Sequence, residues 1–192
     1  MKPNVFKLLI ISILSFVILG CSFHSDLKPS KIEDFNKKIS LAKNKLEKLK
    51  IINDYVNSFE YISDKQNYNQ MEYWADIKEF YSNNGGDCED YAMAKMRLLL
   101  ENGFEENEVY LVLGDISTFA TILSNYIPFV EVNNEHVILL YNDEGKHYLL
   151  DNNLKNIVTS IEQISMNFQP TKYMKLKQVY EERTKRNSID FN

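Results

Sequence analysis

The sequence predicts an α+β fold in which helices precede antiparallel strands. Apolar residues recur with mainly helical spacing between Lys31 and Ser63, and an amphipathic helix pattern returns after Gly86. The segments with strand patterns come later, at 108–114, 135–142 and 146–151. Helices followed by such strands are typical of an antiparallel sheet with helices packed on it.

Length and composition indicate one globular domain with additional segments at its ends. The chain has 192 residues, of which 44% are hydrophobic, 12% aromatic and 26% charged, and a chain of this size usually builds a single core. Its formal net charge is −5, and residues 1–20 contain two lysines and no acid, so the remainder carries −7. An acidic surface argues against nucleic-acid binding, which depends on basic residues.

The first twenty residues predict export. Lys2 and Lys7 flank an apolar run from Phe6 to Leu19, which is short for a membrane span and is followed by Gly20 and Cys21. This pattern is similar to the lipobox of bacterial lipoproteins, with Cys21 as the lipidated residue. An uncleaved membrane anchor is the alternative, and in either case the protein is expected to be tethered to a membrane.

The expected organisation is a lipoprotein signal peptide over 1–20, a tether over 21–30, a globular domain over 31–175 and a polar C-terminal tail over 176–192. Ser22 lacks the acid often associated with inner-membrane retention. We therefore expect a lipid-anchored protein on the periplasmic side of a bacterial membrane, with the outer membrane favoured.

The first half of the domain contains clear signals for helix ends. Residues 31–63 are expected to form one or two amphipathic helices, and the Lys-rich face between Lys37 and Lys50 is interpreted as solvated surface. Asp76 is expected to cap a short helix through Tyr81.

Another amphipathic helix is expected from Cys88 to Gly103, which ends it as glycine commonly does. It follows the loop signal Asn83-Asn84-Gly85-Gly86. The residues expected to turn inward are Met93, Met96, Leu99 and Leu100.

Segments 135–142 and 146–151 predict a hairpin around the turn Asn142-Asp143-Glu144-Gly145. A turn centred between Asp143 and Glu144 places His136 directly opposite Asp151, so that the carboxylate can hold one imidazole nitrogen. Residues 115–133 are less regular and are expected to form a loop near any site.

Cys88 is the cysteine left without a partner if Cys21 is lipidated. A lone thiol in an exported protein is either buried and inert or reactive. Cys88 is expected at the start of a helix, where the helix dipole and the free N–H groups lower the pKa of a thiol. Cys88, His136 and Asp151 would supply the nucleophile, base and orienting acid of thiol catalysis, although each alone could have a structural explanation.

Acids surround this thiol and oppose its ionisation. They are Asp87, Glu89 and Asp90. Either the imidazolium of His136 or a bound cation could offset them, and carboxylates are ligands that Ca²⁺ prefers. The simpler interpretation is that acids favour the first turn of a helix.

Several short segments of the chain, taken together, form a recognisable pattern. They are Asp64, Tyr68, Trp74, Glu79, Gly86–Lys95 (GDCEDYAMAK), His136–Leu139 and Leu150–Asn152. With these residues the chain resembles the bacterial transglutaminase-like cysteine proteinases, which include the LapG-type periplasmic proteases. The resemblance covers roughly residues 37–173.

The resemblance implies a papain-like, transglutaminase-like core with Cys88 as nucleophile, His136 as base and Asp151 as orienting residue. It also implies a calcium ion beside the cysteine, held by Asp87 and Glu89 with Asp90. Proteases of this type cut large surface adhesins in biofilm control and are restrained by an inner-membrane receptor that senses cyclic di-GMP, so both are expected partners.

Two departures from the family pattern bear on this expectation. The family's Trp-x-Thr/Ser-Pro-x-Glu is Trp74-Ala75-Asp76-Ile77-Lys78-Glu79 here, without the proline, and the lipid anchor is unusual. Trp74 either lines the cleft or belongs to the core. The sequence therefore predicts a membrane-tethered, calcium-dependent cysteine endopeptidase; the alternatives are a transglutaminase or amide-transferring acylase with the same triad, and a non-catalytic binding lipoprotein.

Overall fold

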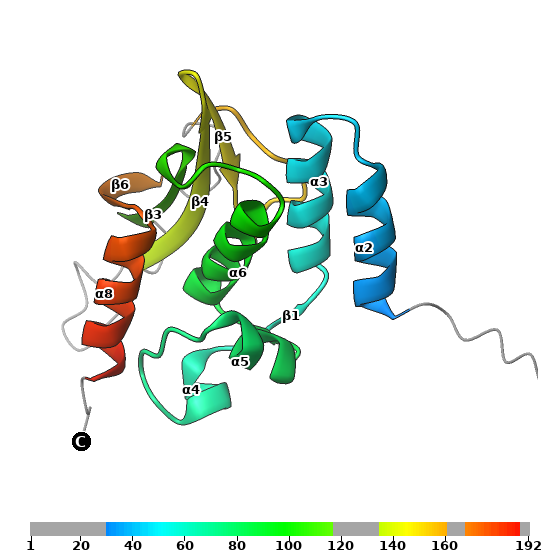
Figure 1. The fold of residues 1–192 in the computed structure, drawn as a ribbon. Coiled ribbons are helices and arrows are strands. Elements are labelled where there is room, and N and C mark those ends of the chain that lie inside the picture. Colours follow the sequence, from blue (N-terminus) through cyan, green and yellow to red (C-terminus); the bar gives the residue numbers. More distant parts are fainter. Residues whose placement is uncertain (1–29, 117–134, 161–167, 189–192) are drawn as a thin grey trace, which may run out of the picture. The chain divides into compact units, whose positions relative to one another are not determined.

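Helices α2 to α6 precede strands β3, β4 and β5 as predicted, and a further strand and helix, β6 and α8, follow them (Figure 1). The computed structural model describes residues 30–116, 135–160 and 168–188. Its helices are α2 (Lys31–Leu41), α3 (Lys45–Val56), α4 (Asp64–Tyr68), α5 (Ile77–Ser82), α6 (Cys88–Glu101) and α8 (Leu176–Asn187), with the 3-10 turn η1 (Glu106–Glu108). None of the helices in these described ranges is long and apolar enough to cross a membrane.

An antiparallel sheet with the order β5-β4-β3-β6 supports these helices. Its strands are β3 (Val109–Asp115), β4 (Glu135–Asp143), β5 (Lys146–Leu150) and β6 (Gln169–Met174). A separate parallel pair, which the sequence patterns did not predict, joins β1 (Glu60–Tyr61) to β2 (Gly85–Gly86) just before α6. The α+β prediction, with the cysteine helix packed on an antiparallel sheet, is confirmed.

The larger part of the core lies between the helices and one face of this sheet. Alternate β4 residues such as Val137 and Leu139 join Leu49 and Ile52 of α3 and Leu99 of α6 in one buried cluster. The other face carries a smaller apolar cluster around Ile138, Leu149 and Phe168. Helix α6 therefore runs through the main core and leaves its first turn to face a cavity.

The predicted helix ends are confirmed where the caps can be seen. Oδ1 of Asp76 accepts hydrogen bonds from the backbone N–H groups of Lys78 and Glu79, at 2.8 and 3.0 Å. Glu79 Oε2 accepts from the N–H of Asp76 in return, which completes a capping box. After α6, Gly103 has a φ of +85°, the left-handed conformation that favours glycine.

The hairpin prediction is right about the faces and wrong about the register. Tyr141 pairs with Tyr148 and Asp143 with Lys146, so the loop consists of Glu144 and Gly145, both with positive φ. This is a two-residue turn of the kind that matches strand twist. The register is displaced by two residues from the prediction, and because side chains alternate with period two, every side chain keeps its predicted face.

The polar tail expected from residue 176 is instead helix α8 over Leu176–Asn187. Only Val179 of this helix is buried, so its apolar pattern is weak. Polar contacts attach it to the domain: Arg183 Nε and Asn187 Nδ2 both donate hydrogen bonds to the carbonyl oxygen of Trp74, at 2.7 and 3.0 Å.

Several predictions lie outside the described residues. They concern the signal peptide, the lipidation of Cys21, nearly all of the tether, most of the loop over 115–133 and the last four residues.

Candidate active site

The turn before α6 is built so that the chain can pass close to β1. A Cβ atom on Gly85, which has a φ of +154°, would lie 1.8 Å from the carbonyl oxygen of Glu60. A Cβ on Gly86 would lie 2.2 Å from a carboxylate oxygen of Asp90. The two glycines are therefore required by contacts within the protein.

Cys88 is the first residue of α6 and is half-buried. Its Sγ donates a hydrogen bond to Oε2 of Glu89, at 3.2 Å. Burial, followed by the negative charges of Glu89 and Asp87, raises the pKa of this thiol well above its ordinary value, and the N–H of Val137 opposes this only in part. In this state burial and the acids together favour the protonated thiol.

His136 and Asp151 form the predicted pair. His136 begins the buried part of β4, Asp151 follows β5, and their Nε2 and Oδ1 atoms are 3.1 Å apart. Asp151 Oδ1 also accepts from the backbone N–H of Asn153, at 2.9 Å. The two residues are thus diagonal neighbours across the hairpin, and not directly opposite as the predicted register required.

The protonation of this pair follows from its contacts. Burial would raise the pKa of Asp151, but the hydrogen bond and charge of His136 and the N–H of Asn153 hold it below its ordinary value. Because the carboxyl group is ionised and can only accept, Nε2 of His136 carries a hydrogen atom, and this N–H group donates a hydrogen bond to Asp151. Nδ1 is left to accept a proton from another group.

Cys88 and His136 line the same cavity, which has a volume of about 410 Å³. Within the described part of the chain, no hydrogen bond joins Sγ to the imidazole, since the thiol donates to Glu89. The structure thus brings Cys88 and His136 to one cavity, with Asp151 in contact with His136, while the thiol is engaged by an acid.

Three carboxylates gather beside the thiol. One oxygen from each of Asp64, Asp87 and Glu89 lies within 4.8 Å of the others. Oδ1 of Asp64 and Oδ1 of Asp87 are buried and accept no hydrogen bond from any described residue. Hard oxygen donors with free lone pairs in this arrangement fit a calcium ion.

The pKa values of the three carboxyl groups in this cluster are all raised above their ordinary values. Burial and the charge of Asp87 raise the pKa of Asp64 to about 7. Burial likewise raises the pKa values of Asp87 and Glu89. Three acids crowded away from water would favour a cation among them.

Asp90 lies outside this cluster, in contrast to its prediction as a metal ligand. Its Oδ1 accepts a hydrogen bond from the N–H of Ala75, at 2.7 Å, and its Oδ2 from the N–H of Asp87, at 3.4 Å. Its role in the structure is to fix the turn before α6. Asp64 takes its place in the cluster; it was noted for the family resemblance but was not assigned as a ligand.

Trp74 belongs to the core and does not line the cleft. Its side chain is fully buried, and Nε1 donates a hydrogen bond to Oε1 of Glu72, at 2.7 Å. The guanidinium of Arg186 lies 5.1 Å from the centre of the ring. Of the two interpretations of Trp74 that the sequence left open, the structure therefore supports the core residue and not the cleft residue.

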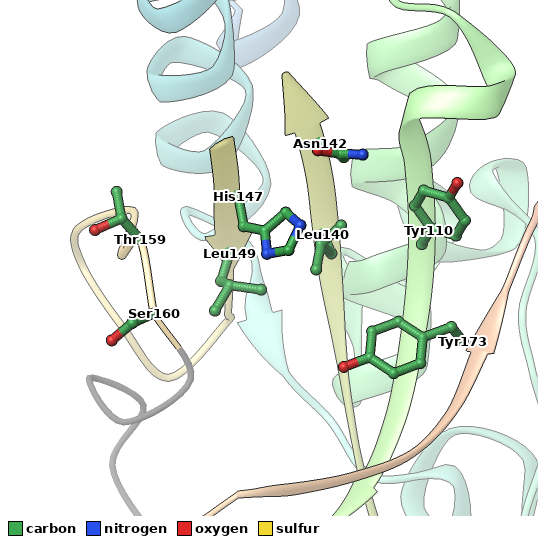
Figure 2. A pocket seen from close by; sticks show the side chains of 8 residues that line it. All are labelled: Tyr110, Leu140, Asn142, His147, Leu149, Thr159, Ser160 and Tyr173. Atoms are coloured by element: carbon green, nitrogen blue, oxygen red, sulfur yellow. The ribbon is translucent and has the colours of Figure 1, made fainter. Parts of the chain in front are cut away.

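The other described histidine belongs to a different cavity. Figure 2 shows His147 beside Leu140 and Leu149, with Tyr110 and Tyr173 on the other side. The cavity that these residues line has a volume of about 490 Å³. His147 pairs with residue 142, six positions along β4 from residue 136, which corresponds to about 20 Å.

Asn57 is a supporting residue that the sequence patterns did not reveal. Located at the C-terminal end of α3, its Nδ2 donates hydrogen bonds to the carbonyl oxygens of Asp151 and Leu154, at 3.0 and 3.1 Å. It ties the loop that carries Asp151 to the helical layer. No motif could have indicated it, because the contact spans more than ninety positions of the chain.

Comparison with solved structures supports the fold. LapG of Legionella pneumophila matches with a TM-score of 0.60 at 21% identity, over 82% of this chain and 88% of that chain. Its calcium-bound form matches at 0.57 and 22%, over 75% and 74%, and its EGTA-treated form at 0.57 and 20%, over 82% and 88%. None of the curated protein sequences matches the chain.

The family follows from the sequence match. Residues 23–185, most of the chain, match the family described as bacterial transglutaminase-like cysteine proteinase, BTLCP. This range contains the cysteine helix, the histidine strand and the aspartate loop. The chain therefore belongs to the bacterial transglutaminase-like cysteine proteinases, and is a cysteine peptidase.

Proposed function

We propose that this protein is a membrane-tethered, calcium-dependent cysteine endopeptidase that cleaves an exported protein by means of Cys88, His136 and Asp151. One observation carries the proposal: the imidazole that is held by Asp151 lines the same cavity as the thiol and the acidic cluster. The anchor, the calcium requirement and the catalytic roles are all parts of this proposal.

The chain's own residues account for each proton in the reaction. Nδ1 of His136 takes the Sγ proton of Cys88, and the thiolate attacks the peptide carbonyl carbon. The backbone N–H of Cys88 helps to hold the oxyanion. His136 then returns the proton to the leaving amine, and it activates the water that hydrolyses the thioester. Asp151 fixes the imidazole throughout.

Calcium would be held by Asp64, Asp87 and Glu89. Bound there, it would supply positive charge that neutralises the acids now holding the thiol protonated. Because Glu89 is also the acceptor of the Cys88 S–H group, its engagement elsewhere would free the thiol for His136. Calcium-bound and EGTA-treated forms of LapG support the choice of this ion.

The substrate we propose is a large surface adhesin, cut in the control of biofilms. The family membership and the LapG-like fold support it. Tyr61 and Met71, both at the cavity and more than half exposed, offer apolar contact for a substrate side chain. An inner-membrane receptor that senses cyclic di-GMP is the proposed regulatory partner, and the Cys21 lipid anchor would keep the enzyme at the periplasmic side of its membrane.

Incubation of the full-length protein with purified surface proteins tests the proposal. We expect two fragments in calcium and none in excess chelator, detected by mass spectrometry. The Cys88→Ala variant should yield no fragments while its far-UV circular dichroism and Tm stay close to wild type. Cleavage by that variant would exclude thiol catalysis, and a crosslinked or amine-bearing product would indicate acyl transfer instead.

A further inference from the structure

Helix α6 contains a lysine that the proposed chemistry does not use. Lys95 is 0% exposed, and its Nζ forms no hydrogen bond with any described residue. It follows Cys88 by seven residues, which is two turns along the same face of the helix, or about 10.5 Å. A buried ammonium without partners is costly, so its location needs an explanation.

The charged group that acts on Lys95 is Asp151. Burial lowers the pKa of Lys95 to about 7, and the negative charge of Asp151 opposes this shift. The elements that contact α6 most extensively are α3, α5, β2, β3 and β4, and Asp151 is the one described acid or base that influences the pKa of Lys95. The buried polar side chain of α3, Asn53, is uncharged.

The same interaction acts in the other direction. Lys95 is one of the groups that lower the pKa of Asp151 against the effect of burial. Asp151 is 2% exposed and its partner His136 is 4% exposed, so water does little to stabilise a negative charge there. When His136 is neutral, Lys95 is the described cation that can balance the carboxylate.

We propose that Lys95 is a positioning residue of the active site, whose buried ammonium keeps Asp151 ionised so that it continues to accept the Nε2 proton of His136. The inference rests on the proposed roles of His136 and Asp151. A protonated Asp151 would no longer be a charged acceptor, and the imidazole would lose the contact that leaves Nδ1 directed to its proton-accepting role.

Substitution by methionine separates this role from a structural one. Lys95→Met removes the charge and keeps a long apolar side chain, and such replacements of buried charges often leave stability unchanged or higher. The measurement is the downfield proton resonance of His136 Nε2–H, assigned by its loss in His136→Gln, followed by NMR as the pH is lowered in calcium buffer. It requires no substrate, so it can be interpreted even if the protein cleaves no candidate adhesin.

In Lys95→Met we expect this resonance to disappear at a pH about one unit higher than in wild type. Lys95→Arg, which keeps the charge, should disappear within a few tenths of a unit of wild type. If a cleaved substrate is found, kcat should fall in the methionine variant with KM unchanged.

A folded Lys95→Met protein whose resonance behaves as in wild type would overturn the proposal, as would an equal change in the Lys95→Met and Lys95→Arg variants. Lys95→Gln serves as the neutral variant if the methionine protein does not fold.

Discussion

At the scale of single residues, Asp64 gives the sharpest test of the metal site. Its Oδ1 is buried without a hydrogen-bond donor among the described residues, while its Oδ2 accepts from the N–H of Tyr73. An amide at this position removes one negative charge from the proposed ligand set. We therefore expect Asp64→Asn to weaken calcium binding at least tenfold, on the order of the loss that follows from perturbing metal ligands.

Isothermal titration of the purified protein with calcium measures this effect. Asp54→Asn is the matched control, because Asp54 is an exposed aspartate of α3, and its affinity should equal that of wild type. Unchanged affinity in Asp64→Asn would show that the ion, if it binds, is held elsewhere.

The sequence revealed those site residues that lie near one another in the chain or in recognisable motifs. Cys88 with its flanking acids was found in this way, and His136 and Asp151 through the hairpin. Asp64 and Lys95 were noted only as part of the family resemblance and were given no role, because their importance depends on distances set by packing. The N–H of Asp64 donates to Asp87 across 23 positions, and no periodicity in the sequence reports such a contact.

At the scale of elements, the hairpin shows what a pattern determines and what it leaves open. Alternation fixed which face of β4 and β5 each side chain occupies, and it therefore placed His136 and Asp151 together. The register depended on the position of the turn. Glu144 and Gly145, both with positive φ, form its loop, and composition alone did not identify these two residues as the loop.

Helix α8 was missed for a different physical reason. Its attachment depends on charged and polar side chains, which resemble those of a solvated tail until their partners are known. Arg186 shows this best: its guanidinium donates to Oε1 of Glu72 at 2.8 Å and, through Nη2, to Oε2 of Glu135 at 3.1 Å. Both acids line the Cys88 cavity, so α8 supports the rim of the site.

We expect Arg186→Gln to destabilise the protein by about 2 kcal/mol, because it leaves partly buried acids less well neutralised and removes the cation from the Trp74 ring. Thermal unfolding should show a Tm lower by roughly 4 to 8 °C. Lys177→Gln is the control: the Lys177–Glu181 pair is 3.9 Å apart and its lysine is 85% exposed, so the Tm should stay within about 1 °C. Equal effects of the two changes would show that the α8 contacts add little.

At the scale of the whole molecule, the helices and the sheet contribute opposite halves of one site. Helix α6 and the chain before it supply the thiol and the acidic cluster, whereas the β4–β5 hairpin supplies the base and its acid. A change in charge at the cluster should therefore alter the stability of the fold as well as the pKa of the thiol. The turn Gly85–Gly86, which leads into the cluster, is packed between β1 and Asp90. Calcium should consequently affect stability and activity together.

The stability of the calcium-free protein should fall as the pH rises from 5 to 7. Burial, with the charge of Asp87, raises the pKa of Asp64 to about 7 and that of Asp90 to about 8. A carboxyl group with a raised folded pKa contributes stability that is fully present below its unfolded pKa, near 4, and is lost as the pH rises through the folded value.

In excess chelator we expect the Tm to drop by roughly 5 to 10 °C between pH 5 and pH 7. Saturating calcium should raise the Tm and flatten the dependence, since it binds the ionised carboxylates of the folded state. Scanning calorimetry at constant ionic strength measures both curves, and a Tm that stays level or increases with pH in chelator would contradict the burial of these acids.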